Sequence, residues 1–122
     1  MSGETNRGHA PEVNEGNFEI EVLRSPQPTL VAFSAPWSKP CQIVQCVLGE
    51  IEAQGQGKIR VLRVNVDNNP DLGLWYGIES VPTLLWFVGG KVCARIIGTA
   101  TKEAILAKLA SLGAGAPAAG PS

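Results

Sequence analysis

The chain has 122 residues, 44% of them hydrophobic, which is enough for one domain with a single core. Its formal net charge of −1 excludes the strong positive field with which proteins bind nucleic-acid phosphates or an anionic membrane surface. No apolar run approaches the roughly 18 residues that span a bilayer, and the segment MSGETNRGHAPEVNEG lacks the apolar core of a signal peptide. We therefore expect a soluble, monomeric, cytoplasmic domain whose partners are neither nucleic acids nor membranes.

The two ends of the chain differ in composition from its middle. Residues 1–12 mix Gly, Asn, Glu and Pro without periodicity, and residues 113–122 consist mainly of Gly, Ala and Pro. Such segments bury too little apolar surface to compensate for the entropy lost on ordering. We expect two disordered tails around one folded domain at residues 13–112.

Within this domain, helical and strand patterns alternate along the chain. A helical pattern that begins at Phe18 is followed by the apolar strand TLVAF and by a helix from about Ser38 to Ala53. The strand IRVLRVNV and a short helix around Leu72 come next. The strands TLLWFV and KVCARII and a closing helix from about Lys102 complete the domain.

The character of the strands predicts the architecture. TLVAF and IRVLRVNV are apolar with little alternation, which is typical of central strands covered by helices on both faces. TLLWFV and KVCARII are separated by Gly89 and Gly90, the short-turn signature of an antiparallel hairpin. We expect a single α/β domain with a central mixed β-sheet flanked by helices. These patterns alone do not give the strand order.

The three cysteines are expected to be free thiols. Cys41, Cys46 and Cys93 are an odd number in a chain without an export signal, which argues against a disulfide framework. Five residues apart on a helix, Cys41 and Cys46 would have Cα atoms roughly 8–9 Å apart, beyond the ~7 Å limit for a disulfide. His9 stands alone in a tail, so we expect neither a metal site nor a cofactor.

Four features, from about Asn14 to Leu109, resemble the thioredoxin family: FEIEVL, VAFSAPWSKPC, VNVDNNPDLGLWYGIESVPTLLWFVGGKV and Gly98. The resemblance implies the thioredoxin fold and a cis peptide bond before Pro82. It also implies thiol–disulfide exchange with protein or peptide partners, among them glutathione or a thioredoxin reductase. The implied substrate-binding residues are Trp37, Lys39, Pro40, Val81, Pro82, Thr83 and Gly98.

The segment APWSKPC departs from the family at its first cysteine position. Family members carry Cys-x-x-Cys at the start of a helix, where an exposed first cysteine attacks a substrate disulfide and the second resolves the product. In this chain Ser38 occupies the first position and Cys41 the second. A serine hydroxyl forms no stable sulfur-exchange product, so a two-cysteine cycle within the motif is excluded.

Three further departures lie around the motif. Ala32 stands where the family commonly carries a buried aspartate that assists proton transfer, Ser34 where it carries a tryptophan, and Cys46 where it carries a proline. Arg63 matches a position at which a basic residue lies near that aspartate. Without the aspartate, we expect Arg63 to extend toward solvent.

The individual side chains leave alternatives open. Ser38 is a good helix N-cap, and that role alone explains it. Cys41 is either an inert buried thiol or a reactive monothiol, since a helix N-terminus and the nearby Lys39 favour a thiolate. Cys46 is expected to pack inside the helix layer, and strand alternation places Cys93 on a polar face.

Three functional hypotheses follow. The first is a thioredoxin-like protein with at most monothiol chemistry through Cys41. The second is a redox-inactive module that binds peptides or proteins in the groove beside Pro82. The third is an ordinary disulfide reductase whose first cysteine was changed to Ser38 by engineering.

Overall fold

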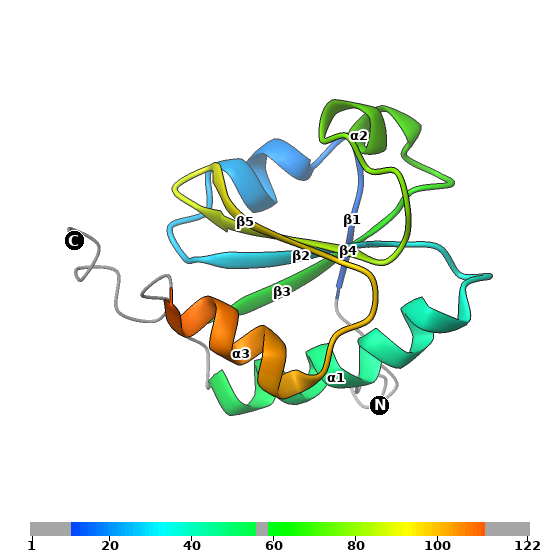
Figure 1. Cartoon of the computed structure of the whole chain (residues 1–122). Helices are drawn as coiled ribbons and strands as arrows, with labels where there is room; N and C mark the ends of the chain where they lie inside the picture. Colours follow the sequence, from blue (N-terminus) through cyan, green and yellow to red (C-terminus); the bar gives the residue numbers. More distant parts are fainter. Residues whose placement is uncertain (1–10, 56–58, 112–122) are drawn as a thin grey trace, which may run out of the picture.

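A five-stranded sheet with the order β1-β3-β2-β4-β5 forms the centre of the computed structural model, which describes residues 11–55 and 59–111 (Figure 1). The strands are β1 (Glu12–Val13), β2 (Thr29–Ser34), β3 (Arg60–Asn65), β4 (Thr83–Val88) and β5 (Lys91–Ile97). The helices are the π-helix η2 (Glu19–Leu23), α1 (Lys39–Gly55), α2 (Pro70–Trp75) and α3 (Lys102–Ser111).

The pairing of the strands confirms the expected mixed sheet. β1, β3 and β2 run parallel, whereas β4 is antiparallel to both β2 and β5. β4 and β5 form the hairpin expected around Gly89 and Gly90, and both glycines have positive φ, as tight hairpin turns require.

Strand β1 is not predictable from the sequence, because two residues are too short to carry a strand pattern. It is held by pairing with β3, and the Arg63 amide donates to the Pro11 carbonyl at 2.9 Å. Glu12, placed at the end of the expected N-terminal tail, therefore belongs to the sheet. The remaining tail expectations, at residues 1–10 and 113–122, lie outside the described residues.

Helices cover both faces of the sheet and create two cores (Figure 1). α1 and α3 pack on one face, where Leu30 and Ala32 of β2 meet Leu48 of α1 and Ile105 of α3. η2 and α2 lie on the other face, where Val31 of β2 joins a second apolar cluster. All six residues of β2 are buried, which explains why its sequence lacks alternation. No helix of the described part is long and apolar enough to cross a membrane.

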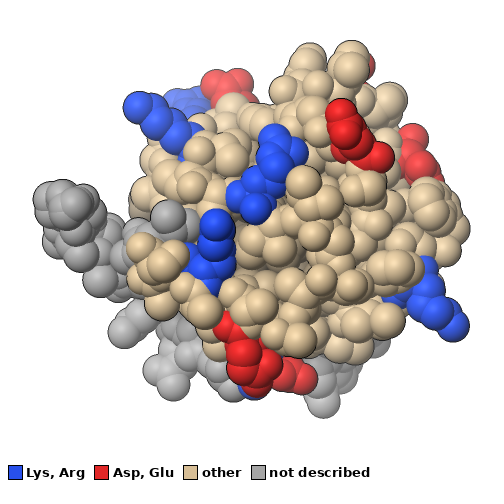
Figure 2. All heavy atoms as spheres, viewed as in Figure 1, with Lys and Arg blue, Asp and Glu red and all other residues tan. Residues whose placement is uncertain are grey.

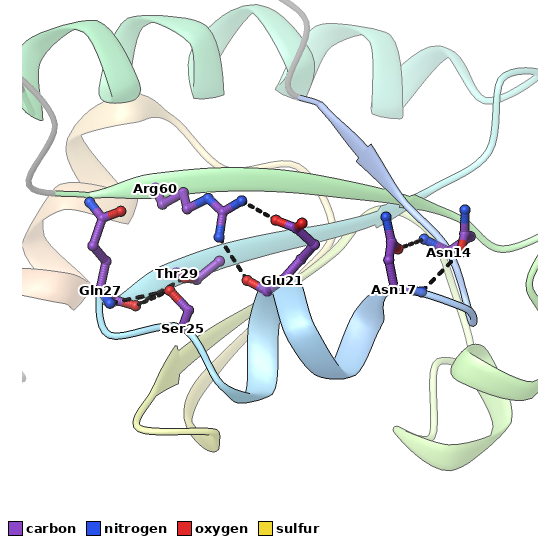
Figure 3. Close-up of polar contacts among 7 residues, drawn as sticks. All are labelled: Asn14, Asn17, Glu21, Ser25, Gln27, Thr29 and Arg60. Carbon is purple, nitrogen blue, oxygen red and sulfur yellow. Dashed lines mark hydrogen bonds and ion pairs between the residues drawn. The ribbon is translucent and has the colours of Figure 1, made fainter.

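Short polar contacts fix η2 against the sheet (Figure 3). The guanidinium of Arg60 donates to the Glu21 carbonyl at 2.7 Å and forms an ion pair with the Glu21 carboxylate. After the helix, the hydroxyls of Ser25 and Thr29 both donate to the Gln27 carbonyl, at 3.2 and 3.1 Å. These bonds give the loop between η2 and β2 a defined path and hold η2 over its core.

The two hairpin glycines differ in what a side chain would meet. Gly89 has φ +61° with open space around it, whereas Gly90 has φ +83° and a Cβ there would lie 2.7 Å from the Leu23 carbonyl oxygen. Gly89→Ala should cost about 1–2 kcal/mol through the left-handed backbone alone. Gly90→Ala adds a backbone clash and should cost roughly 3 kcal/mol or more. Urea unfolding of both variants tests this, and equal losses would contradict the close approach to Leu23.

Candidate functional site

The loop between β2 and α1 presents Ser38 as the N-cap of α1. The Ser38 hydroxyl oxygen accepts the Cys41 amide at 3.3 Å, and the Ser38 carbonyl accepts the Gln42 amide at 3.2 Å. The Ser38 amide in turn donates to the Ala35 carbonyl at 3.1 Å, which closes the turn. The expected capping role of Ser38 is therefore present, since these bonds satisfy amides that a helix start leaves free.

Both motif positions are withdrawn from solvent. Ser38 is 4% exposed, which corrects the expectation that the first position is exposed. The physical reason is its capping bond, which turns the hydroxyl back toward the first turn of α1. Cys41 is 3% exposed and lies on the core face of the helix with Val44 and Leu48. Neither side chain offers a freely accessible nucleophile.

The other two thiols are exposed. Cys93 lies on the solvent side of β5, as strand alternation predicted. Cys46 was expected to pack inside the helix layer, and that expectation is wrong. The buried face of α1 is set by Cys41, Val44 and Leu48. Because successive helix positions differ by about 100°, residue 46 falls on the opposite side from residues 44 and 48.

A cleft of about 890 Å³ opens beside Ser38. One wall is the start of α1 with the residues before it, and the other is α2 with the segment that leads to β4. Most of the lining is apolar. The lining residues are Trp37, Ser38, Lys39, Pro40, Val66, Pro70, Gly73, Leu74, Gly77, Ile78, Glu79, Ser80 and Val81.

Five of the sequence-predicted site residues meet in this cleft: Trp37, Ser38, Lys39, Pro40 and Val81. Four others are not part of its lining: Cys41, Pro82, Thr83 and Gly98.

The loop before β4 is braced by two of those residues. The Val81–Pro82 peptide bond is cis, as expected. The Thr83 hydroxyl donates to the Ser80 carbonyl at 2.8 Å, and the Gly98 amide donates to the Pro82 carbonyl at 2.9 Å. Thr83 and Gly98 therefore hold the loop that contributes Ser80 and Val81 to the cleft.

The α2 wall was not predicted as part of the site. Leu74 is 77% exposed and lines the cleft, whereas Leu72 of the same helix is fully buried. The available signal was the run LGLWYGI, which holds more large apolar residues than one face of a six-residue helix can bury. An apolar side chain left outside the core beside a groove is a candidate contact residue.

Trp37 stands at the rim of the cleft in a fixed orientation. It is 70% exposed, and its indole N–H donates to Asp67 Oδ2 at 2.9 Å. The Asp67 amide donates to the Asn65 side chain at 2.9 Å, so the loop after β3 is itself ordered. An exposed aromatic held by a hydrogen bond is a pre-organised contact surface.

The structure modifies the expectation that Arg63 extends toward solvent because Ala32 replaces its usual partner. Ala32 and Arg63 lie opposite each other in the β2–β3 register. Arg63 reaches outward as expected, and its guanidinium lies 3.4 Å from the Glu12 carboxylate. Its Nε, however, is buried without a hydrogen-bond partner among the described residues. The small Ala32 leaves that donor unsatisfied.

The titratable side chains that line the cleft are Lys39 and Glu79. Burial raises the pKa of Tyr76, which packs against Phe18, Phe33 and Phe87 and is not part of the cleft lining. Within residues 11–55 and 59–111, no group of three or more His, Cys, Asp or Glu side chains is placed to hold a metal ion.

A family model described as Thioredoxin matches residues 9–111. Thioredoxin 1 of Nostoc sp. is 44% identical over 96 residues, which are 79% of this chain and 90% of that protein. The chloroplastic M-type thioredoxin of Chlamydomonas reinhardtii is 41% identical over 100 residues, 82% of this chain and 71% of that protein. The bifunctional thioredoxin reductase/thioredoxin of Mycobacterium leprae is 36% identical over 112 residues, 92% of this chain and 24% of that protein.

Proposed function

Because the chain belongs to the thioredoxin family, we propose that it binds extended segments of partner proteins in its cleft without reducing their disulfides catalytically. One observation carries this proposal: the cleft is open and mostly apolar, but no cysteine lines it. The cleft therefore offers an apolar contact surface to a partner but no thiol for disulfide exchange.

The thiols of the described chain support binding over redox turnover. A dithiol cycle needs an exposed attacking thiolate and a second thiol within disulfide distance. Cys41 is buried behind Ser38, and the exposed Cys46 and Cys93 lie outside the cleft lining. No thiol in the described residues meets both conditions.

The backbone of Val81 supports an extended ligand. Val81 lines the cleft, and among the described residues its N–H and C=O make no hydrogen bond. The neighbouring carbonyls of Ser80 and Pro82 are already occupied by Thr83 and Gly98. A free donor and acceptor on one residue can pair with the backbone of an added strand, which gives affinity without side-chain chemistry.

The monothiol hypothesis is a second candidate, since Cys41 is a free thiol in the first turn of α1. It requires that turn to open, because the buried sulfur is otherwise out of reach. Glutathione is the smallest proposed partner for such chemistry. A mixed disulfide at Cys41 after incubation with oxidised glutathione, detected by peptide mass spectrometry, would favour this candidate.

Thioredoxin reductase remains a proposed docking partner. One relative is named as a reductase joined to a thioredoxin, and this chain matches part of that protein. In the proposed function the reductase docks without turnover. A monomeric state and a cytoplasmic location are likewise part of the proposal.

Cysteine-free decapeptides selected from a random display library on the full chain test the proposed function. Calorimetric Kd values should stay within about twofold in Cys41→Ala, since the thiol does not contact the ligand. Leu74→Asp should weaken binding about tenfold or more by placing a charge in the apolar wall. Trp75→Asp is the matched control, because Trp75 is 66% exposed on the same helix but is not part of the lining. Loss of binding in Cys41→Ala, or equal loss in both Asp variants, would refute the proposal.

A further inference from the structure

The cleft contains two charged side chains of opposite sign on different walls. Lys39 belongs to the wall at the start of α1, and Glu79 belongs to the segment between α2 and β4. Both are exposed, and the rest of the lining is apolar or uncharged. Each wall therefore carries one charge beside an apolar surface.

Neither charge is neutralised by a neighbour within the described chain. The ion pairs there join Arg60 to Glu21, Arg63 to Glu12 and Lys102 to Glu50, and none involves the cleft. Lys39 and Glu79 also make no side-chain hydrogen bond among the described residues. Both are thus available to a ligand.

The location of Lys39 is unfavourable for the helix itself. A cation in the first turn opposes the helix dipole, which has its positive end there, and the first turn of α1 contains no acidic residue. The helix end and Lys39 together make the Ser38 side of the cleft attractive to a negative charge. Glu79 makes the opposite side of the cleft attractive to a positive charge.

We propose that the cleft selects an extended protein segment in which apolar residues lie between one acidic and one basic side chain. The acidic residue pairs with Lys39, the basic residue pairs with Glu79, and the apolar residues pack against Leu74 and Trp37. This inference rests on the proposed binding function and adds the chemistry of the ligand to it.

The arrangement also rejects other segments. A uniformly acidic ligand meets Glu79, and a uniformly basic one meets Lys39, so each leaves one repulsive contact. The wider surface adds no competing preference on the face drawn in Figure 2, where basic and acidic side chains are scattered among uncharged ones. Among the described residues that line the cleft, Lys39 and Glu79 are the charged ones, so the proposed selection by charge is assigned to them.

Charge reversal tests the inference. One decapeptide from the library selection is synthesised with its acidic and basic residues in place and again with the two exchanged. The unaltered chain should prefer the first peptide about tenfold, as expected for two partly exposed charge contacts. The double variant Lys39→Glu/Glu79→Lys should prefer the exchanged peptide. The matched control, Glu103→Lys/Lys108→Glu, reverses two exposed charges of α3 outside the lining and should keep the original preference.

The outcomes separate this inference from the function on which it rests. Equal binding of both peptides to the unaltered chain, or an unchanged preference in the double variant, refutes charge selection while peptide binding stands. Inversion by the α3 control as well would show a general field effect and also refutes it. A library selection that yields no binding peptide refutes the proposed function itself.

Discussion

Ser38→Cys is expected to convert a chain without multiple turnovers into a measurable disulfide reductase. A sulfur at position 38 would lie where Ser38 Oγ now accepts the Cys41 amide at 3.3 Å. Such amides and the helix dipole stabilise a thiolate. The new sulfur would also be one helical turn from Cys41, which can then resolve a mixed disulfide.

Reductase activity of the Ser38→Cys variant requires that the buried position 38 become accessible to a substrate. The residue lines the cleft although it is only 4% exposed, so a thiol there must turn toward the cleft to meet a substrate. Reductase-coupled NADPH oxidation with a protein disulfide measures the turnover, and mass spectrometry detects the 38–41 disulfide. Ser38→Ala is the control; it should stay inactive and lose about 1 kcal/mol of stability with the cap. A folded Ser38→Cys variant without disulfide or activity would contradict the proposed motif geometry.

Adding Ala32→Asp to the Ser38→Cys variant should raise the rate by about 10²-fold. Ala32 is buried on the face of the sheet that α1 covers. In the thioredoxin family this position commonly carries the buried aspartate that assists proton transfer at the second cysteine. Burying a carboxylate costs stability. Part of that cost should be recovered, because Ala32 lies opposite Arg63, whose Nε lacks a partner in the described chain.

The matched control for this second change is Ala32→Asn. It has nearly the same shape and can also accept from Arg63, but an amide transfers no proton at neutral pH. The rate should therefore rise with Asp and not with Asn in the Ser38→Cys background, measured in the same assay. Equal rates in the two variants would mean that position 32 does not assist the resolving thiol.

The parts of the fold with strong local signals could be predicted from sequence. The hairpin was predictable because Gly89 and Gly90 separate two β-rich runs, and the cap at Ser38 because serine satisfies a helix start. β1 escaped detection because two residues carry no periodicity, and pairing with β3 alone defines it. Features that depend on local residue chemistry could be predicted, whereas a strand defined only by pairing with another strand could not.

In the candidate site, too, some residues could be predicted from sequence and others could not. The residues near Ser38 and Val81 were expected from the resemblance, whereas the α2 wall depends on how Leu72 fills the core and leaves Leu74 outside. The exposure of Cys46 depends on the rotation of α1 about its axis, which Val44 and Leu48 fix by packing. Neither is encoded in a short motif.

The most direct test of the central claim is the same reductase assay on the unaltered chain. NADPH oxidation is followed with thioredoxin reductase and a protein disulfide such as insulin. Since no described cysteine lines the cleft, we predict less than one turnover per chain above the reductase-only background. Clear multiple turnovers, in proportion to the concentration of the chain, would contradict a function in binding without catalytic reduction.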